Sequence, residues 1–296
     1  LAAGGPGDHG YDFHDGPNQN AHGDSDDPMD PKRIFSVTQR ANEFMVDRVV
    51  ADKPFFIQIS HYAVHTEIQA LQDTNYKYAH LGPGGRHTAT KYAAMTENLD
   101  TGVGMLLNKI DELGIADNTY VIYVSDNGAE KEPSNNFPLV KSKASLWEGG
   151  IRVPMVVRGP NIHANSISDV PVTTTDLFPT ISDLMGANTP LPEGLEGGSL
   201  RDVLENDGAG MVARSTEALF WHFPHYRFAG GPSPHSAVRS GDYKLIKLYE
   251  TGELMLFNLA EDIREKEFNN LADVEPERRD RLHQMLNDWL DQVDGS

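Results

Sequence analysis

Residues 120–128 read YVIYVSDNG, so a carboxylate and a carboxamide, both able to bind a metal ion, follow a short apolar run. A run of this length and composition predicts a buried parallel strand, which ends abruptly at Ser125. Asp126 and Asn127 would then follow the carboxyl end of a strand, which is the edge where open α/β sheets bind ligands. A carboxylate beside a carboxamide suits Ca²⁺ or Mg²⁺. The alternative is that Asp-Asn-Gly simply makes a turn.

A histidine and a lysine elsewhere in the chain could act on an anion. His65 ends the segment HYAVHT, and an imidazole can bind an anion or transfer a proton because it changes charge near neutral pH. Lys143 comes shortly before a glycine pair at 149–150, which allows a tight turn. Simpler interpretations exist for both, since a loop histidine is often structural and most lysines are surface charges.

The elements that must position these side chains alternate between helix and strand. The helix with the clearest pattern lies between His87 and Gly114, because apolar residues recur every three or four positions and Gly114 can end the helix. It leads directly into the strand before Asp126, an order typical of a doubly wound sheet. Residues 1–30 are rich in Gly, Pro, Asp and His and predict a loop. Further helices are expected over 31–52 and 173–186, and further strands over 54–60, 61–66 and 154–159.

The pattern changes after a Pro, Gly and acid-rich stretch at 188–210. Short β-like runs over 217–223, 236–239, 243–248 and 253–259 predict an antiparallel meander. An amphipathic helix opened by Pro276 should cover one face of it. We therefore expect an α/β domain over residues 1–205 and a C-terminal α+β subdomain over residues 206–296.

Composition excludes several classes of function. Asp and Glu number 44 against 25 Lys and Arg, so the net charge of −19 disfavours a nucleic-acid partner. No apolar run approaches the roughly 20 residues of a membrane helix, so no membrane partner is expected. The chain has no cysteine and hence no thiol nucleophile. It starts at Leu1 without a signal-peptide pattern, and we expect it to be the remainder of a longer chain.

Five phrases, in order over nearly the whole chain, resemble the sulfatases of the alkaline-phosphatase superfamily. The phrases are SHYAVHT, VIYVSDNG, KASLWEGGIRVP, TTTDLFPTISDLMG and the tail that begins SAVRSGDYKLIK. The resemblance implies a mostly parallel sheet flanked by helices, incomplete at its N-terminal side. It also implies that Asp126 and Asn127 bind Ca²⁺ in preference to Mg²⁺, that His65 contacts the sulfate and helps with proton transfer, and that Lys143 binds a sulfate oxygen. Such charges would stabilise a transferring sulfuryl group.

The sequence also departs from the family pattern. The family's nucleophile is a formylglycine made from Cys or Ser in a Cys-x-Pro-Ser-Arg-like motif, and no such motif is present. The family's amino-terminal aspartate pair is missing as well, and Glu67 stands where the family often has proline. This chain alone should therefore be inactive. The missing N-terminal segment could be a separate chain.

The reaction that the resemblance implies is hydrolysis of a sulfate ester. Residues 221–226 read WHFPHY, in which His222 and His225 offer donors and the aromatic rings offer faces of the kind that sugars use. They favour a sulfated carbohydrate over an aryl sulfate ester, unless Trp221 and Phe223 are core residues. A non-catalytic sulfatase-like binding protein, and a phosphodiesterase or phosphonate hydrolase, remain as alternatives. By analogy with bacterial sulfatases, we expect a periplasmic or secreted protein.

Overall fold

The computed structural model describes residues 5–14, 23–84, 87–226 and 233–293. The chain forms two compact units, Leu1–Ala116 and Asp117–Ser296, and each is described by itself. The domain boundary expected near residue 205 stays a prediction. Among the described residues, no helix combines the length and the apolar character that crossing a bilayer requires.

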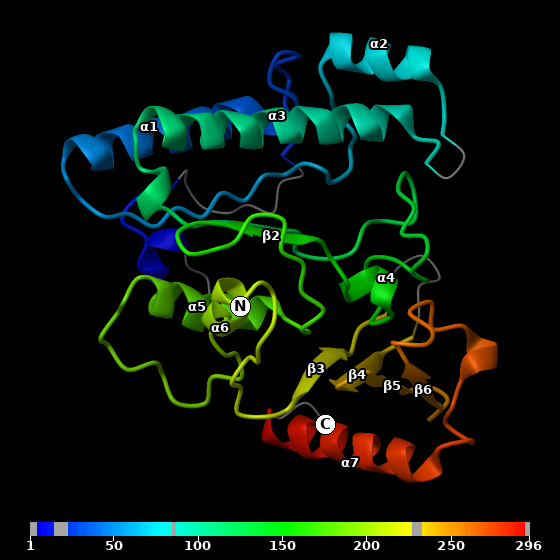
Figure 1. The fold of residues 1–296 in the computed structure, drawn as a ribbon. Coiled ribbons are helices and arrows are strands. Elements are labelled where there is room, and N and C mark those ends of the chain that lie inside the picture. Colours follow the sequence, from blue (N-terminus) through cyan, green and yellow to red (C-terminus); the bar gives the residue numbers. More distant parts are fainter. Residues whose placement is uncertain (1–4, 15–22, 85–86, 227–232, 294–296) are drawn as a thin grey trace. The chain divides into compact units, whose positions relative to one another are not determined.

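The first unit is a helical layer. It contains α1 (Ile34–Val50), α2 (Gln72–Leu81) and α3 (Thr90–Glu112), with single 3₁₀ turns at Pro6–His9 and Pro31–Arg33. Both α1 and α2 pack on α3 (Figure 1). At Gly102 of α3, a Cβ atom would lie 2.8 Å from the side chain of Ile34, so this glycine lets α1 approach closely. The predictions of α1 and α3 are confirmed, and Gly114 follows α3 with φ +69°.

The two strands predicted over 54–60 and 61–66 are wrong, since the structure assigns no strand to either segment. Side chains 55–60 do alternate between half-buried and exposed, as they would in a strand. Among the described residues, however, this backbone has no neighbouring strand to pair with. Apolar alternation indicates an extended chain, but a ladder also requires a partner. Residues 61–66 instead contain a turn, in which His65 N donates to Tyr62 O at 2.8 Å.

The second unit opens with a two-stranded sheet. Its strands, β1 (Val121–Val124) and β2 (Met155–Arg158), are antiparallel, with Val121 opposite Arg158. Both strands lie where the sequence predicts them. The buried parallel setting expected for β1 is not found among the described residues, because its pairing there is antiparallel and Tyr123 is 40% exposed.

A short helix, α4 (Glu148–Ile151), replaces the tight turn expected at the glycine pair. A Cβ atom at Gly149 would lie 2.3 Å from Val140 O, and one at Gly150 would lie 2.0 Å from Ser145 O. The two glycines are therefore required for close backbone packing, not for a left-handed turn. The segment that carries Lys143 leads directly into α4.

Between β2 and the C-terminal sheet lie a 3₁₀ turn at Thr174–Asp176, α5 (Leu177–Leu184) and α6 (Arg201–Glu205), and another 3₁₀ turn at Ala116–Asn118 precedes β1. The helix predicted over 173–186 is present as α5 and the 3₁₀ turn before it, and Thr173 N donates to Asp176 Oδ2 at 2.8 Å at the start of that turn. Asp176 is fully buried and also accepts from Arg214 at 2.7 and 2.8 Å. This ion pair ties the start of α5 to the chain that enters the C-terminal sheet.

The C-terminal sheet is the predicted antiparallel meander. Its strands are β3 (Ala218–Phe223), β4 (His235–Ser240), β5 (Tyr243–Leu248) and β6 (Leu254–Asn258), in that order, and a 3₁₀ turn follows at Glu267–Asn269. As predicted, α7 (Pro276–Gln292) covers one face (Figure 1), where it packs on Val238, Leu245 and Leu256. The other face presents Ala237, Ile246 and Phe257 to Leu146 and Trp147. The segment that carries Lys143 therefore covers the second face.

Candidate functional site

The loop after β1, which carries Asp126 and Asn127, packs against the backbone of α4 through Gly128. Gly128 N donates to Gly150 O at 2.9 Å, and a Cβ atom at Gly128 would lie only 2.0 Å from Gly149 O. Gly128 is not among the glycines with positive φ. Close backbone packing thus accounts for a glycine at this position.

Lys143 belongs to the same cluster of loops. Its backbone N donates to Ala129 O at 3.0 Å, two residues beyond Asn127. Two nearby residues, Lys141 and Ala144, have left-handed backbones with φ 62° and 65°. Residues other than glycine adopt this conformation at an energetic cost and concentrate at functional sites. The structure therefore brings Lys143 to the Asp126–Asn127 loop and holds it there in an unusual backbone.

The Asp126 and Asn127 side chains suit a hard divalent cation in part. Both present oxygen atoms of the type that Ca²⁺ prefers. Within the described part of the chain, neither side chain has a hydrogen bond or ion pair. The same part of the chain contains no group of three or more His, Asp or Glu that could hold a metal ion. The residues present therefore fit two of the 6–8 oxygen ligands that Ca²⁺ usually takes.

His65 lies in the other compact unit and is exposed. Its Nδ1 is 2.6 Å from Thr66 O. Because a carbonyl only accepts, Nδ1 carries a hydrogen. A second histidine, His61, lies 3.1 Å from Thr38 Oγ1 and attaches this turn to α1. Burial lowers the pKa of His61, so it is neutral at physiological pH.

The two histidines predicted to bind substrate lie at the end of β3. His225 is exposed and His222 is half-buried, whereas Trp221 and Phe223 pack on the core beneath. Both aromatic side chains are themselves half-buried, so they border the core and are not among its buried residues. Burial, with a smaller contribution from the charge of His225, lowers the pKa of His222, so its imidazole is neutral near pH 7.

A hydrogen-bonded network that the sequence analysis missed orients His222. Its Nδ1 is 2.7 Å from Ser236 Oγ, which is 2.8 Å from the hydroxyl of Tyr249. The Tyr249 ring meets the imidazole edge-to-face at 6.0 Å. Ser236 lies opposite His222 in the β3–β4 register. Only that register brings them together, so the meander pattern predicts strands here but not this contact.

Comparisons with known proteins cover nearly the whole chain. The family model described as "Sulfatase" matches residues 8–187, and the model "N-sulphoglucosamine sulphohydrolase, C-terminal" matches residues 141–294. A sulfatase of Formosa agariphila is 36% identical over 270 residues, which cover 83% of this chain and 48% of the relative. The chain thus spans about half the length of this curated relative.

Two solved structures agree with these matches. Ps i-CgsB superimposes with a TM-score of 0.75 at 26% identity, over 86% of this chain and 54% of that one, and it has also been solved with k-i-k-neocarrahexaose. A structure with its substrate D-Glucosamine-2-N,6-O-disulfate bound superimposes with a TM-score of 0.56 at 28% identity, over 69% of this chain and 40% of that one. The α/β fold expected from the sequence, with its small C-terminal sheet and covering helix, is confirmed. Since a family model matches well over half of the chain, the protein belongs to the sulfatase family, within the alkaline-phosphatase-like superfamily.

Proposed function

We propose that the protein takes part in hydrolysis of a sulfated carbohydrate, in which water and a sulfate ester give an alcohol and inorganic sulfate. One observation carries the proposal: the backbone of Lys143 is hydrogen-bonded at 3.0 Å to Ala129, beside the Asp126–Asn127 loop. An ammonium group and two hard oxygen ligands therefore come from one loop cluster. In a sulfatase, such a cluster suits a sulfate group.

Each predicted residue has a distinct role in this proposal. Asp126 and Asn127 would contribute two ligands to Ca²⁺, which supplies positive charge to the sulfuryl oxygens when it is bound. Lys143 would contact a sulfate oxygen and stabilise the negative charge that develops in the transition state. His65 would exchange a proton through Nε2, because Nδ1 is committed to Thr66 O.

The carbohydrate part of the proposal rests on the end of β3. His222 and His225 would donate to sugar hydroxyls or sulfate oxygens, and the network through Ser236 and Tyr249 would fix the orientation of His222. The sugars bound in the two solved relatives support this substrate class. A small aryl sulfate would reach the sulfate-binding groups but would not use these histidines.

The nucleophile is the part that these 296 residues do not supply. The chain has no cysteine, and no serine lies in the motif from which the family makes formylglycine. We propose that a segment outside these residues carries it, either in the same polypeptide before processing or as a separate chain. We also propose that the protein acts in the periplasm or outside the cell, which cell fractionation would test.

The first experiment is a denaturing intact-mass spectrum of purified protein with peptide mapping, followed by sulfate-release assays on the same material. Material that contains a formylglycine-bearing peptide should release sulfate from sulfated oligosaccharides, and the 296-residue chain alone should not. Release by the chain alone would contradict the proposed source of the nucleophile. A faster reaction on phosphate or phosphonate esters would favour the phosphodiesterase or phosphonate hydrolase alternative. Binding of sulfated sugars without turnover in any form would favour a non-catalytic protein.

A further inference from the structure

His235, the first residue of β4, joins two segments that lie far apart in the sequence. Its side chain is fully buried, with Nε2 2.9 Å from Leu146 N and Nδ1 2.7 Å from Ser233 O. A backbone amide only donates and a carbonyl only accepts, so both ring nitrogens have fixed roles. Nδ1 carries the hydrogen, and the lone pair of Nε2 accepts from Leu146. The imidazole is therefore held in one neutral tautomer.

The surroundings of His235 maintain this state. The ring lies 5.4 Å from that of Trp147 and 5.6 Å from that of Phe223. Burial lowers the pKa of His235. The bond to Ser233 O raises it in part, and the positive charge of Lys244 lowers it further. A proton on Nε2 would face the Leu146 amide hydrogen, so the contact exists only while the ring is neutral.

The contact lies next to Lys143 along the chain. Leu146 follows Lys143 by three residues, and Ala144 between them has a left-handed backbone with φ 65°. On its other side, the segment is held by the bond from Lys143 N to Ala129 O. A backbone strained at Ala144 keeps its conformation only if its surroundings impose it. The bond to His235 is one of the constraints that do so.

We propose that His235 is a positioning residue that fixes the Lys143 segment for sulfate-ester hydrolysis. The inference rests on the proposed function and extends it to a residue of the C-terminal sheet. His235 acts through Leu146 and does not itself contact the substrate. It also connects the histidine-bearing end of β3 to Lys143, because Phe223 packs on its ring.

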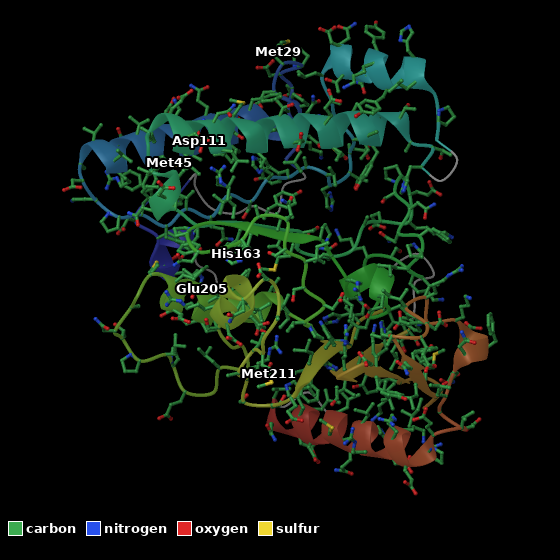
Figure 2. All side chains as sticks on the ribbon, in the orientation of Figure 1. Met29, Met45, Asp111, His163, Glu205 and Met211 are labelled. Atoms are coloured by element: carbon green, nitrogen blue, oxygen red, sulfur yellow. The ribbon has the colours of Figure 1, made fainter. Side chains whose placement is uncertain are left out.

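Two substitutions separate this contact from general packing. In His235→Gln, the side-chain oxygen can accept from Leu146 N much as Nε2 does, whereas in His235→Asn the amide can still donate to Ser233 O but nothing reaches Leu146. His163 provides a control substitution to Asn, since it is an exposed histidine of this unit (Figure 2) whose Nδ1 lies 2.5 Å from Asp207 Oδ1. Hydrogen exchange at Leu146 is measured on this chain, and kinetics are measured on material that hydrolyses sulfate esters.

We expect His235→Asn to speed exchange of the Leu146 amide by about tenfold or more, since one buried hydrogen bond is lost. The same variant should lower kcat/KM by about 10–100-fold, mainly through kcat, because the lysine is displaced from the transition state. His235→Gln should restore both quantities to within about threefold, and His163→Asn should change neither.

Equal losses in the Gln and Asn variants would overturn the proposal, because packing would then explain them. Faster exchange with unchanged kcat, in a protein that Lys143→Ala inactivates, would also overturn it. If no form hydrolyses a sulfate ester, the proposed function fails and the inference falls with it, while the exchange data still report whether His235 holds the segment. If His235→Asn does not fold, the hydrogen bond is tested by NMR in the unsubstituted chain. We expect a scalar coupling across the hydrogen bond between Leu146 N and His235 Nε2, and its absence would overturn the proposal.

Discussion

The ammonium of Lys244 lies 2.9 Å from the carboxylate of Glu148, and both side chains are buried. The same ammonium also forms an ion pair with Glu265 Oε1, at 2.8 Å. Glu265 Oε2 in turn accepts from Glu148 N at 2.5 Å. Burial raises the pKa of Glu265. Burial opposes ionisation of Glu148 too, but Lys244 and two arginines lower its pKa overall. This cluster attaches α4, and so the end of the Lys143 segment, to β5.

Lys244→Met should destabilise the protein by about 3–5 kcal/mol, because two buried carboxylates would lose their shared cation. The free energy of unfolding of the whole chain in urea measures the effect. Lys247→Met on the same strand is the control, since Lys247 is only half-buried and bonds Asn287 Oδ1 at 3.0 Å. The control should cost about 1 kcal/mol or less. Equal effects of the two substitutions would show that the buried cluster is not held by Lys244.

Gly128→Ala should destabilise the loop that carries Asp126 and Asn127. The added Cβ atom would lie 2.0 Å from Gly149 O, a backbone atom that cannot move alone. We expect a loss of about 1–3 kcal/mol in unfolding free energy, as for other overpacked sites. Gly104→Ala in α3 is the matched control, because nothing lies within 4 Å of its new Cβ and alanine favours a helix by about 1 kcal/mol. The two substitutions should therefore have opposite signs, and a neutral Gly128→Ala would contradict the packing described above.

Patterns over a few neighbouring residues predicted the helices and strands that depend mainly on those residues. The apolar periodicity of α3 and the turn residues of the C-terminal meander each act over a few residues, and the structure has both elements. By contrast, α2 was missed because QDTNYKYAHL is mostly polar. Its start depends on Asn98 of α3, which accepts from Leu71 N and donates to Thr74 Oγ1. That contact is tertiary and leaves no periodic signal.

The candidate site also combines residues that local sequence indicates with contacts that depend on distant parts of the chain. Strand-end position pointed to Asp126 and Asn127, and their proximity to Lys143 could be expected only through the family resemblance. The bond between Leu146 and His235 spans 89 residues, and the sequence has no feature that indicates it. The strand predicted at 54–60 was wrong for a related reason, because pairing depends on a neighbour that the local pattern cannot reveal.

His61 should make the first unit less stable in mild acid. Burial lowers its folded-state pKa below the ordinary 6.5, so the unfolded chain takes up the proton first as the pH falls. Its contribution is fully present above about pH 6.5 and is lost below it, by at most about 1.4 kcal/mol per pH unit. Unfolding free energies from about pH 7.5 to pH 5 should fall more steeply in the unsubstituted protein than in His61→Gln. Identical slopes in the two proteins would exclude this role of His61.

Tyr249→Phe should weaken binding of a sulfated oligosaccharide without unfolding the sheet. The lost hydroxyl lies 2.8 Å from Ser236 Oγ, which orients His222. Removing one hydrogen bond of this kind should reduce affinity by about 3–10-fold, measured by calorimetry. Tyr76→Phe in α2 removes a hydroxyl that accepts from Gln72 and serves as the control. Unchanged affinity in Tyr249→Phe would remove this network from the proposed sugar site.

Calcium dependence tests the metal ligands separately from substrate binding. Material that hydrolyses sulfate esters should lose activity in a chelator and recover it with Ca²⁺. Asp126→Asn removes one carboxylate charge from the ligand set, so about 10–100-fold more Ca²⁺ should be needed for half-maximal recovery and for the Ca²⁺-induced rise in melting temperature. Asp117→Asn, at an exposed position before β1, should respond to Ca²⁺ as the unsubstituted protein does. A melting temperature that rises equally with Ca²⁺ in both variants would place the cation elsewhere, and the two hard oxygens after β1 would then need another explanation.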